Sequence, residues 1–243
     1  MEILKILAQR QYNPHGAKSA TMCFLGDSVT HGCFELKKTP EGNIDTIFEY
    51  DEAYCKKLER LLKTAYPSAQ LNVINSGISG DTAVGGLKRL DRDVLSFNPD
   101  FVSVCFGLND CGRREEGLLD YLNSLDKIFK KLKDGGVKDV VFMTPNMMNT
   151  YVSSSITDPM FIDFAKNSMD IQMGGTLKKY IDGAKEVAFE NKVTVCDCYL
   201  EWETMFNSGV DVTELLANKM NHPTRDMHWL FAHSLVRKIF LGK

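Results

Sequence analysis

A serine near the start of the chain has surroundings that could make it a nucleophile. Ser28 follows an apolar run at residues 21–25 and lies between Gly26 and Gly32. A buried strand that ends at Gly26 would lead into a tight turn, which holds the serine hydroxyl at the edge of a sheet. Backbone N–H groups at the start of a following helix would point at an oxyanion formed beside it. Because Gly-Asp-Ser is a common tripeptide, acyl transfer needs support from other segments.

Three later segments supply the groups that such a serine would need. Gly80 lies in the segment NSGISGDT and could bring a bare N–H close to a ligand. Asn109, in the segment GLND, can donate from its side-chain amide. His222 precedes Pro223, which suits the first turn of a helix and would fix the imidazole at its entrance. A histidine held in this way can act as the general base for the serine.

The apolar periodicity predicts that these segments lie in an alternating series of strands and helices. Strands are predicted at residues 21–25, 71–74, 101–106, 140–143 and 192–196. Helices are predicted at residues 52–65, 82–95, 118–132, 166–190 and 225–240. This order predicts an α/β fold, namely a flavodoxin-like three-layer α/β/α sandwich around a mostly parallel five-stranded sheet. The chain has no internal repeat and no linker rich in Pro, Gly or Ser, so residues 1–243 are predicted to form one domain.

The four segments, taken together and in this order, resemble those of the SGNH (GDSL-type) serine esterase/lipase family. The resemblance extends from residue 22 to about residue 232, which is nearly the full chain. It implies that Ser28 is the nucleophile and His222 the base. It also implies an oxyanion hole made by the Ser28 N–H, the Gly80 N–H and the Asn109 side chain. No metal or other cofactor is implied, because the oxyanion hole takes the part of a Lewis acid.

One position departs from the pattern of that family, which usually places an Asp three residues before the histidine. Here the position is Lys219, and a lysine cannot accept a hydrogen bond from the imidazole. We predict that Asn218 presents its amide oxygen to the ring instead, as the third catalytic residue. The alternatives are Asn221, Asp211, Glu214 and a backbone carbonyl in a Ser-His dyad. Asp27, beside the nucleophile, is predicted to organise its loop, and His31 to contribute to loop structure or a pocket wall.

The resemblance implies a small-molecule ester as substrate, and relatives of this size favour deacetylation of a small carbohydrate ester. Lysophospholipase, thioesterase or aryl esterase activity is the alternative within the same fold. A different class of function is a non-catalytic relative that binds an acylated ligand, and Lys219 is its only support. A flavodoxin-like nucleotide-binding domain is excluded because no glycine-rich phosphate loop is present. The connection at residues 144–160 is predicted to be a lid, a substrate wall or a surface loop.

Composition restricts the partners of the protein. The net charge is −3 and no segment concentrates basic residues, which argues against nucleic acid. The mixed run KRLDRD at residues 88–93 is interpreted as a solvated helix face. No run approaches the roughly 20 apolar residues of a membrane span. Seven cysteines without repeated spacing predict buried free thiols, and with an N-terminus unlike a signal peptide they predict a cytoplasmic protein. A homo-oligomer is compatible with this composition.

Overall fold

The structure is a computed structural model and describes residues 1–242. Its centre is a five-stranded sheet in which every pairing is parallel, in the order β4-β1-β5-β6-β7. The strands are β1 (Ala20–Gly26), β4 (Leu71–Gly77), β5 (Phe101–Cys105), β6 (Asp139–Met143) and β7 (Thr194–Cys196). Most of their residues are buried because helices cover both faces of the sheet. The predicted flavodoxin-like α/β/α sandwich is therefore confirmed.

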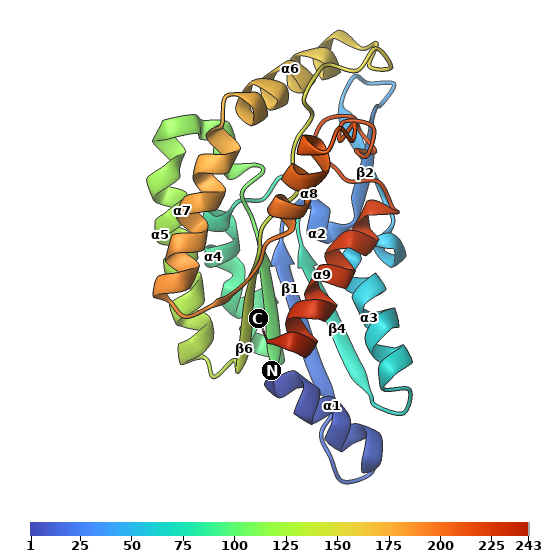
Figure 1. Cartoon of the computed structure of the whole chain (residues 1–243), viewed down its shortest axis with the longest axis vertical. Coiled ribbons are helices and arrows are strands. Elements are labelled where there is room, and N and C mark those ends of the chain that lie inside the picture. The colour runs from blue at the N-terminus through green and yellow to red at the C-terminus, as the bar shows by residue number, and fades with distance from the viewer. Residues whose placement is uncertain (243) are drawn as a thin grey trace.

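Two groups of helices form the outer layers. Figure 1 shows α4, α5 and α7 on one side of the sheet, and α3 and α9 on the other. Their bounds are α3 (Tyr54–Ala65), α4 (Ala83–Asp93), α5 (Arg114–Asp134), α7 (Thr176–Glu190) and α9 (Met227–Leu241). The shorter helices are α1 (Glu2–Tyr12), α2 (Ser28–His31) and α8 (Cys198–Asn207), with 3₁₀ turns η1 (Tyr50–Glu52), η2 (Leu95–Phe97) and η3 (Asp110–Arg113). Helices α1 and α9, the first and last of the structure, contact each other.

Two further elements lie near the carboxyl ends of the strands. The hairpin of β2 (Cys33–Lys38) and β3 (Ile44–Phe48) is antiparallel and separate from the main sheet. Helix α6 (Pro159–Met173) crosses the top of the molecule in Figure 1. Both therefore lie at the edge of the sheet where ligands bind in this class of fold.

The elements differ from the predicted series in four places. The single helix predicted at residues 166–190 is two helices, because Gly175 adopts a left-handed φ of 76° and ends the first one. Helices α1 and α8 and the β2–β3 hairpin were not predicted. Strand β3 has no buried residue, so its sequence lacks the buried alternation that marks a strand.

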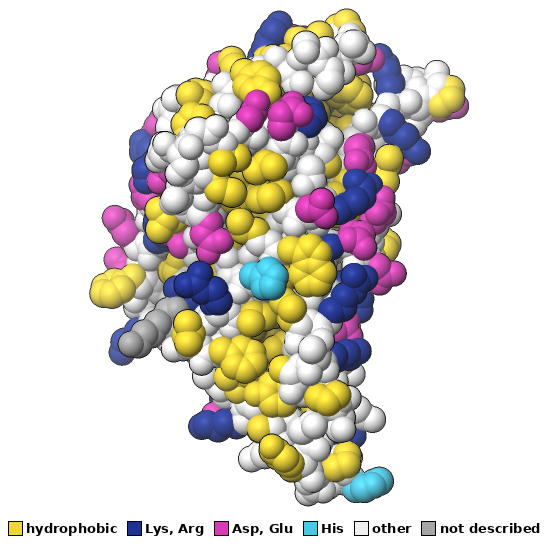
Figure 2. Space-filling view, turned by 45° about the vertical axis from the view of Figure 1, so that its right-hand side comes forward, with side chains coloured by type: hydrophobic (Ala, Val, Ile, Leu, Met, Phe, Trp, Pro, Cys, Tyr) yellow, Lys and Arg dark blue, Asp and Glu magenta, His cyan; other side chains and the backbone are white. Residues whose placement is uncertain are grey.

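The distribution of surface charges and the state of the cysteines agree with what the composition predicts. On the face drawn in Figure 2, basic and acidic side chains are interspersed with hydrophobic ones. All seven cysteines are free and buried, as predicted. Within the part of the chain that the structure describes, no helix is long and apolar enough to cross a membrane.

Candidate active site

Ser28 is the first residue of the four-residue helix α2, directly after β1. Asp27 caps this helix, because its Oδ1 accepts a hydrogen bond from the Val29 N–H at 3.0 Å. Gly77, at the end of β4, allows the two elements to approach, since a Cβ there would lie 2.2 Å from the His31 nitrogen. The structure thus agrees with the prediction that Asp27 organises its loop, because its side chain caps helix α2.

His222 faces Ser28 across the carboxyl end of the sheet. The Ser28 Oγ and the His222 Nε2 are 3.0 Å apart, and both residues are almost fully buried. The other ring nitrogen, Nδ1, is 2.8 Å from the carbonyl oxygen of Phe34 in β2. A carbonyl oxygen only accepts, so Nδ1 carries the proton and Nε2 presents its lone pair to the serine hydroxyl. This tautomer is the one that a general base requires.

The surroundings of His222 keep the imidazole neutral. Burial lowers its pKa to about 4, against the opposing effects of the Phe34 carbonyl and the Glu35 carboxylate. The ring is therefore unprotonated at neutral pH and can accept a proton from Ser28 when an acyl group is attacked.

The predicted oxyanion residues lie on two adjacent loops. Gly80 follows β4 with a left-handed φ of 78°, a conformation that favours glycine. Asn109 follows β5, and its Nδ2 donates to the carbonyl of Asp81 at 2.8 Å, next to Gly80. Asp110 fixes the same junction, because its Oδ1 accepts from the Ala83 N–H at 2.9 Å. Within residues 1–242, neither the Ser28 nor the Gly80 N–H donates to another backbone carbonyl or side chain, so both can bind an oxyanion.

A buried arginine joins these loops to the sheet. Arg89 of α4 donates to the carbonyl oxygens of Gly26 at 3.0 Å and Ser76 at 2.6 Å, and to Asp81 Oδ2 at 2.7 Å. It is 8% exposed, so the prediction of a solvated face for residues 88–93 is wrong at this position. The burial of Arg89 could not be predicted, because charged residues of both signs alternate there as they do on exposed helices.

Two carboxyl groups beneath the site are also buried. Burial raises the pKa of Asp27 to about 7 and that of Asp110 to about 7. The negative charge of Asp110 further raises the pKa of Asp27, and the negative charge of Asp81 further raises the pKa of both. Both are hydrogen-bonded to backbone N–H groups through one oxygen, which is the arrangement of structural rather than reacting groups.

The predicted contact between Asn218 and the imidazole is wrong. The Asn218 Oδ1 accepts from the backbone N–H groups of Met220, Asn221 and His222 at 2.9 to 3.0 Å. Its amide oxygen is thus used to shape the loop that presents the histidine. The residue type suited both purposes, and only the geometry distinguishes them.

The other candidates for this contact are bound elsewhere. Asp211 accepts from the Tyr151 hydroxyl at 2.8 Å, and Glu214 pairs with Lys219 at 2.9 Å. The Asn221 Oδ1 accepts from Asn218 at 2.9 Å. The backbone carbonyl is the alternative that the structure contains, and it belongs to Phe34. The sequence could not identify this carbonyl, because every residue has a backbone carbonyl whatever its type.

His31 ties the nucleophile helix to the oxyanion loop. Its Nδ1 accepts from the Ser79 N–H at 3.3 Å, and its Nε2 lies 3.2 Å from the Tyr50 hydroxyl. The ring also packs on Phe48, with centroids 4.7 Å apart. The predicted part of His31 in loop structure is consistent with these contacts.

Two cavities are lined by residues that neighbour His222 in sequence, although neither Ser28 nor His222 lines them. One of about 230 Å³ lies against Asn109, Asn221 and Phe164. The other, of about 420 Å³, lies against Glu35 and residues 155–158. Leu36 and Met220 line both cavities and separate them.

The connection after β6 forms part of this cleft. Residues 144–149 are buried, so the interpretation as a surface loop is wrong for this part. The Asn146 Nδ2 donates to the carbonyl of Asn221 at 2.9 Å, and the Asn149 N–H donates to that of Met220 at 2.8 Å. The connection therefore holds the loop at residues 218–222, which carries His222. Its later residues, 155–158, line the cavity beside Glu35.

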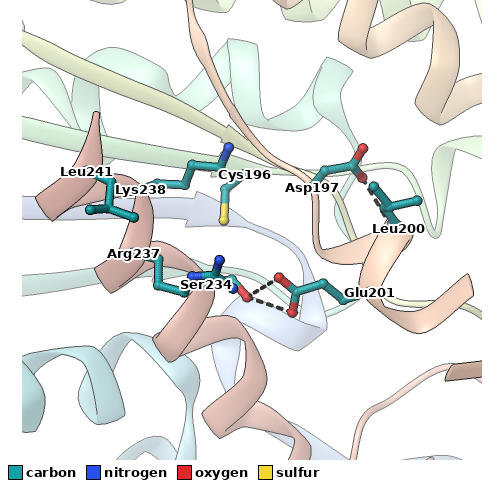
Figure 3. Close-up of a pocket in the computed structure, with 8 residues that line it drawn as sticks. All are labelled: Cys196, Asp197, Leu200, Glu201, Ser234, Arg237, Lys238 and Leu241. Atoms are coloured by element: carbon teal, nitrogen blue, oxygen red, sulfur yellow. Dashed lines mark hydrogen bonds between the residues drawn. The ribbon is translucent and has the colours of Figure 1, made fainter. Parts of the chain in front are cut away.

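A third cavity lies elsewhere, between α8 and α9 beside the end of β7. Figure 3 shows the Ser234 hydroxyl directed at the Glu201 carboxylate, and both Oγ–Oε distances are 2.8 Å. Its volume is about 220 Å³, and Cys196 and Arg237 also line it. None of the predicted site residues contributes to this cavity.

Comparison with known proteins agrees with this geometry. The GDSL-like Lipase/Acylhydrolase family model matches residues 24–230. An acetylxylan esterase of Geobacillus stearothermophilus is 26% identical over 229 residues, which cover 90% of this chain and 93% of that protein.

Solved structures show the same fold. The acetylxylan esterase Axe2 from Geobacillus stearothermophilus superposes with a TM-score of 0.66 at 24% identity, covering 90% of this chain and 94% of Axe2. A two-domain esterase active on acetylated mannans gives a TM-score of 0.67 at 18% identity, covering 98% of this chain and 52% of that one. Catalytic mutants of Axe2 replace a serine, an aspartate and a histidine, the last two being three positions apart. The residue three positions before His222 is Lys219.

Proposed function

The chain belongs to the GDSL-like lipase/acylhydrolase family and is a carboxylic ester hydrolase, and from this premise we propose that it removes acetyl groups from a carbohydrate through Ser28. The observation that carries the proposal is the 3.0 Å contact between the Ser28 Oγ and the His222 Nε2. His222 is also in the tautomer that carries its proton on Nδ1, so Nε2 can only accept a hydrogen bond from the Ser28 hydroxyl.

The reaction begins when His222 takes the hydroxyl proton and the Ser28 Oγ attacks the acetyl carbon. The tetrahedral oxyanion is bound by the Ser28 and Gly80 N–H groups and by the Asn109 side chain, each contributing about 10²–10³ in turnover. The protonated Nε2 then gives its proton to the departing sugar oxygen. The same nitrogen then takes a proton from a water molecule that attacks the acetyl-serine, and it returns this proton to the Ser28 Oγ as acetate leaves.

The cavity beside Asn109 suits an uncharged substrate of moderate size. The cavity beside Asn109 combines apolar side chains with uncharged polar ones, among them Asn167, Ser168 and Asn221. Amide and hydroxyl groups can bind sugar hydroxyls, and apolar side chains can cover a sugar ring. The matched acetylxylan esterase and the esterase active on acetylated mannans support the same class of substrate.

Acetate release from acetylated xylo-oligosaccharides tests the proposal. The wild type should release acetate, and Ser28→Ala should lower turnover by at least about 10³. Ser96→Ala is the matched control, since its exposed hydroxyl is bonded to the Arg92 carbonyl. Equal release by the wild type and Ser28→Ala would exclude Ser28 as nucleophile. Faster hydrolysis of lysophospholipids, acyl thioesters or aryl esters would replace the proposed substrate with one of those classes.

A cytoplasmic location is part of the proposal. Seven buried free thiols are typical of a protein from a reducing compartment. Fractionation of the native source should recover the protein with the cytoplasmic fraction, and recovery with a secreted fraction would contradict this.

A further inference from the structure

The carbonyl that faces His222 is available because the β2–β3 hairpin contains a β-bulge. Cys33 pairs with Phe48 and Leu36 pairs with Thr46, so two residues of β2 lie opposite one residue of β3. Those two residues are Phe34 and Glu35. A bulge releases backbone groups from the hydrogen-bonding ladder and redirects them, and here the released carbonyl is bound by the His222 Nδ1 at 2.8 Å.

An ion cluster fixes the bulge to the histidine loop. Arg225, three residues after His222, donates from Nη1 and Nη2 to the two oxygens of Glu35 at 2.6 and 3.0 Å. The same guanidinium donates from Nε to the Glu49 Oε2 at 3.0 Å and from Nη2 to its other oxygen. Glu49 directly follows β3, so Arg225 binds both strands of the hairpin at once. Two-point contacts of this kind fix orientation as well as distance.

The Phe34 side chain is held from both sides. Its ring is fully buried, with the guanidinium carbon of Arg225 4.4 Å from its centroid. On another side it packs on the ring of His228, with centroids 5.0 Å apart. The Nδ1 of His228 in turn accepts from the Tyr54 N–H at 3.0 Å. The residue that supplies the carbonyl therefore has little freedom to rotate away from the imidazole.

The cluster of Arg225, Glu35 and Glu49 has a formal charge of −1. Arg225 lowers the pKa of the Glu35 carboxyl and that of the Glu49 carboxyl, so both remain ionised around neutral pH. A net negative charge behind the imidazole favours the imidazolium that forms during acyl transfer. In a Ser-His-Asp triad the aspartate supplies this charge and also orients the ring.

We infer that Arg225, Glu35 and Glu49 are positioning residues which together replace the triad carboxylate, by holding the Phe34 carbonyl on the His222 Nδ1 and by placing a negative charge behind it. The inference rests on the proposed function of Ser28 and His222. It explains how the site tolerates Lys219, whose ammonium group binds the Glu214 side chain at 2.9 Å and the Glu214 carbonyl at 3.1 Å.

Glu35→Gln and Glu49→Gln form a matched pair for the test. Each substitution neutralises one of the two carboxylates that bind Arg225. The Glu35 and Glu49 side chains are also almost equally exposed, at 38% and 39%. Only Glu35 adjoins Phe34 in sequence and acts through its charge on His222. Arg225→Met removes the centre of the cluster, and Arg225→Lys keeps the charge without the two-point contacts.

Three measurements on the full chain carry the test. The first is the rate at which a fluorophosphonate labels Ser28, followed by mass spectrometry. The second is the acid limb of kcat/KM for p-nitrophenyl acetate. The third is the downfield proton resonance of the His222 Nδ1–H, assigned by its absence in His222→Gln.

Glu35→Gln should slow labelling about ten-fold. It should also move the acid limb to lower pH, because a charge that favours the imidazolium is gone. Glu49→Gln should slow labelling less and move the acid limb less, because only the charge of Glu35 acts directly on His222. Arg225→Met should slow labelling by more than about ten-fold and weaken the Nδ1–H resonance, and Arg225→Lys should recover part of both.

The inference would be overturned if Glu35→Gln and Arg225→Met kept the labelling rate, the acid limb and the Nδ1–H resonance of the wild type. It would also be overturned if Glu35→Gln and Glu49→Gln moved the acid limb equally. If Arg225→Met does not fold, the glutamate pair decides alone. Absence of labelling in the wild type would instead contradict the proposed function, and the resonance would still report whether the cluster positions the imidazole.

Discussion

At the scale of single residues, the site depends on groups whose hydrogen-bonding direction is fixed by their neighbours. The Phe34 carbonyl can only accept, so it sets the tautomer of His222 and leaves Nε2 as the acceptor for Ser28. Three backbone N–H groups converge on the Asn218 Oδ1, so that side chain shapes the loop and does not contact the ring. The functions of the Phe34 carbonyl and the Asn218 side chain are therefore assigned by their geometry more than by residue type.

Gly80 provides a prediction at this scale. An added Cβ would meet nothing within 4 Å, so Gly80→Ala acts only through the strain of its φ of 78°. Relaxation of that strain would rotate the N–H away from the oxyanion. We expect a loss of about 1 kcal/mol in the free energy of unfolding and a fall in kcat of at least about ten-fold.

Gly136→Ala is the matched control for Gly80→Ala. Gly136 has a φ of 83° and equally open space, and it lies before β6, at the edge of the sheet opposite the site. It should lose similar stability with kcat unchanged. Urea unfolding and acetate release measure the two effects, and equal kcat values in the two variants would contradict a function of Gly80 in the oxyanion hole.

The sequence identified side-chain groups much better than backbone ones. Ser28, His222, Gly80 and Asn109 are found from their types and order, and the structure brings them to one edge of the sheet. The partner of the His222 Nδ1 could not be found in this way. It arises from a bulge whose register depends on tertiary packing, and no residue type encodes a free carbonyl.

At the scale of elements, buried strands were predicted well and exposed ones were not. The strands of the main sheet are apolar because both faces are covered, which makes each of them visible as a short apolar run. The β2–β3 hairpin is half-exposed and carries charges, so it resembles a loop in sequence. That hairpin nevertheless supplies the Phe34 carbonyl and one wall of the cleft.

Helix α6 provides a prediction at this scale because it forms one wall of the cavity beside Asn109. Phe164 of this helix lines the cavity and is 44% exposed. Phe164→Ala should raise KM about five- to ten-fold for an acetylated xylo-oligosaccharide, because it removes apolar contact worth about 1 kcal/mol. The kcat should stay nearly constant, since the lost contact is made equally in the ground and transition states.

Phe189→Ala is the control for this change. Phe189 is 83% exposed near the end of α7, at the edge of the sheet opposite the site. It should leave both kinetic constants unchanged. Initial-rate kinetics on the same oligosaccharide measure them, and an unchanged KM in Phe164→Ala would show that α6 does not contact the substrate.

At the scale of the whole molecule, buried titratable groups act on stability in opposite directions. Burial lowers the pKa of His222 to about 4 and that of His228 to about 3, so folding releases protons from both. Burial raises the pKa of Asp27 and of Asp110 to about 7, so folding takes protons up. Between about pH 5 and 6.5 these contributions oppose one another, which weakens the dependence of stability on pH.

His228→Asn separates one of these contributions from the rest. The asparagine Oδ1 can replace Nδ1 as acceptor for the Tyr54 N–H, while the titrating ring is lost. In the wild type, the unfolded chain binds a proton at His228 below about pH 6.5 that the folded chain does not bind. The stability contributed by the neutral ring is therefore fully present above that pH and is lost as the pH falls toward about 3.

The wild type should accordingly lose about 2 kcal/mol of unfolding free energy relative to His228→Asn between pH 7 and pH 5. Urea unfolding at the two pH values measures this difference, and the opposing aspartates cancel because both proteins contain them. The control is His233→Asn, which makes the same substitution at an exposed histidine of the same helix. A constant difference for His228→Asn would mean that the folded protein accepts a proton on the His228 ring, contrary to its complete burial in a layer that packs against the active-site hairpin.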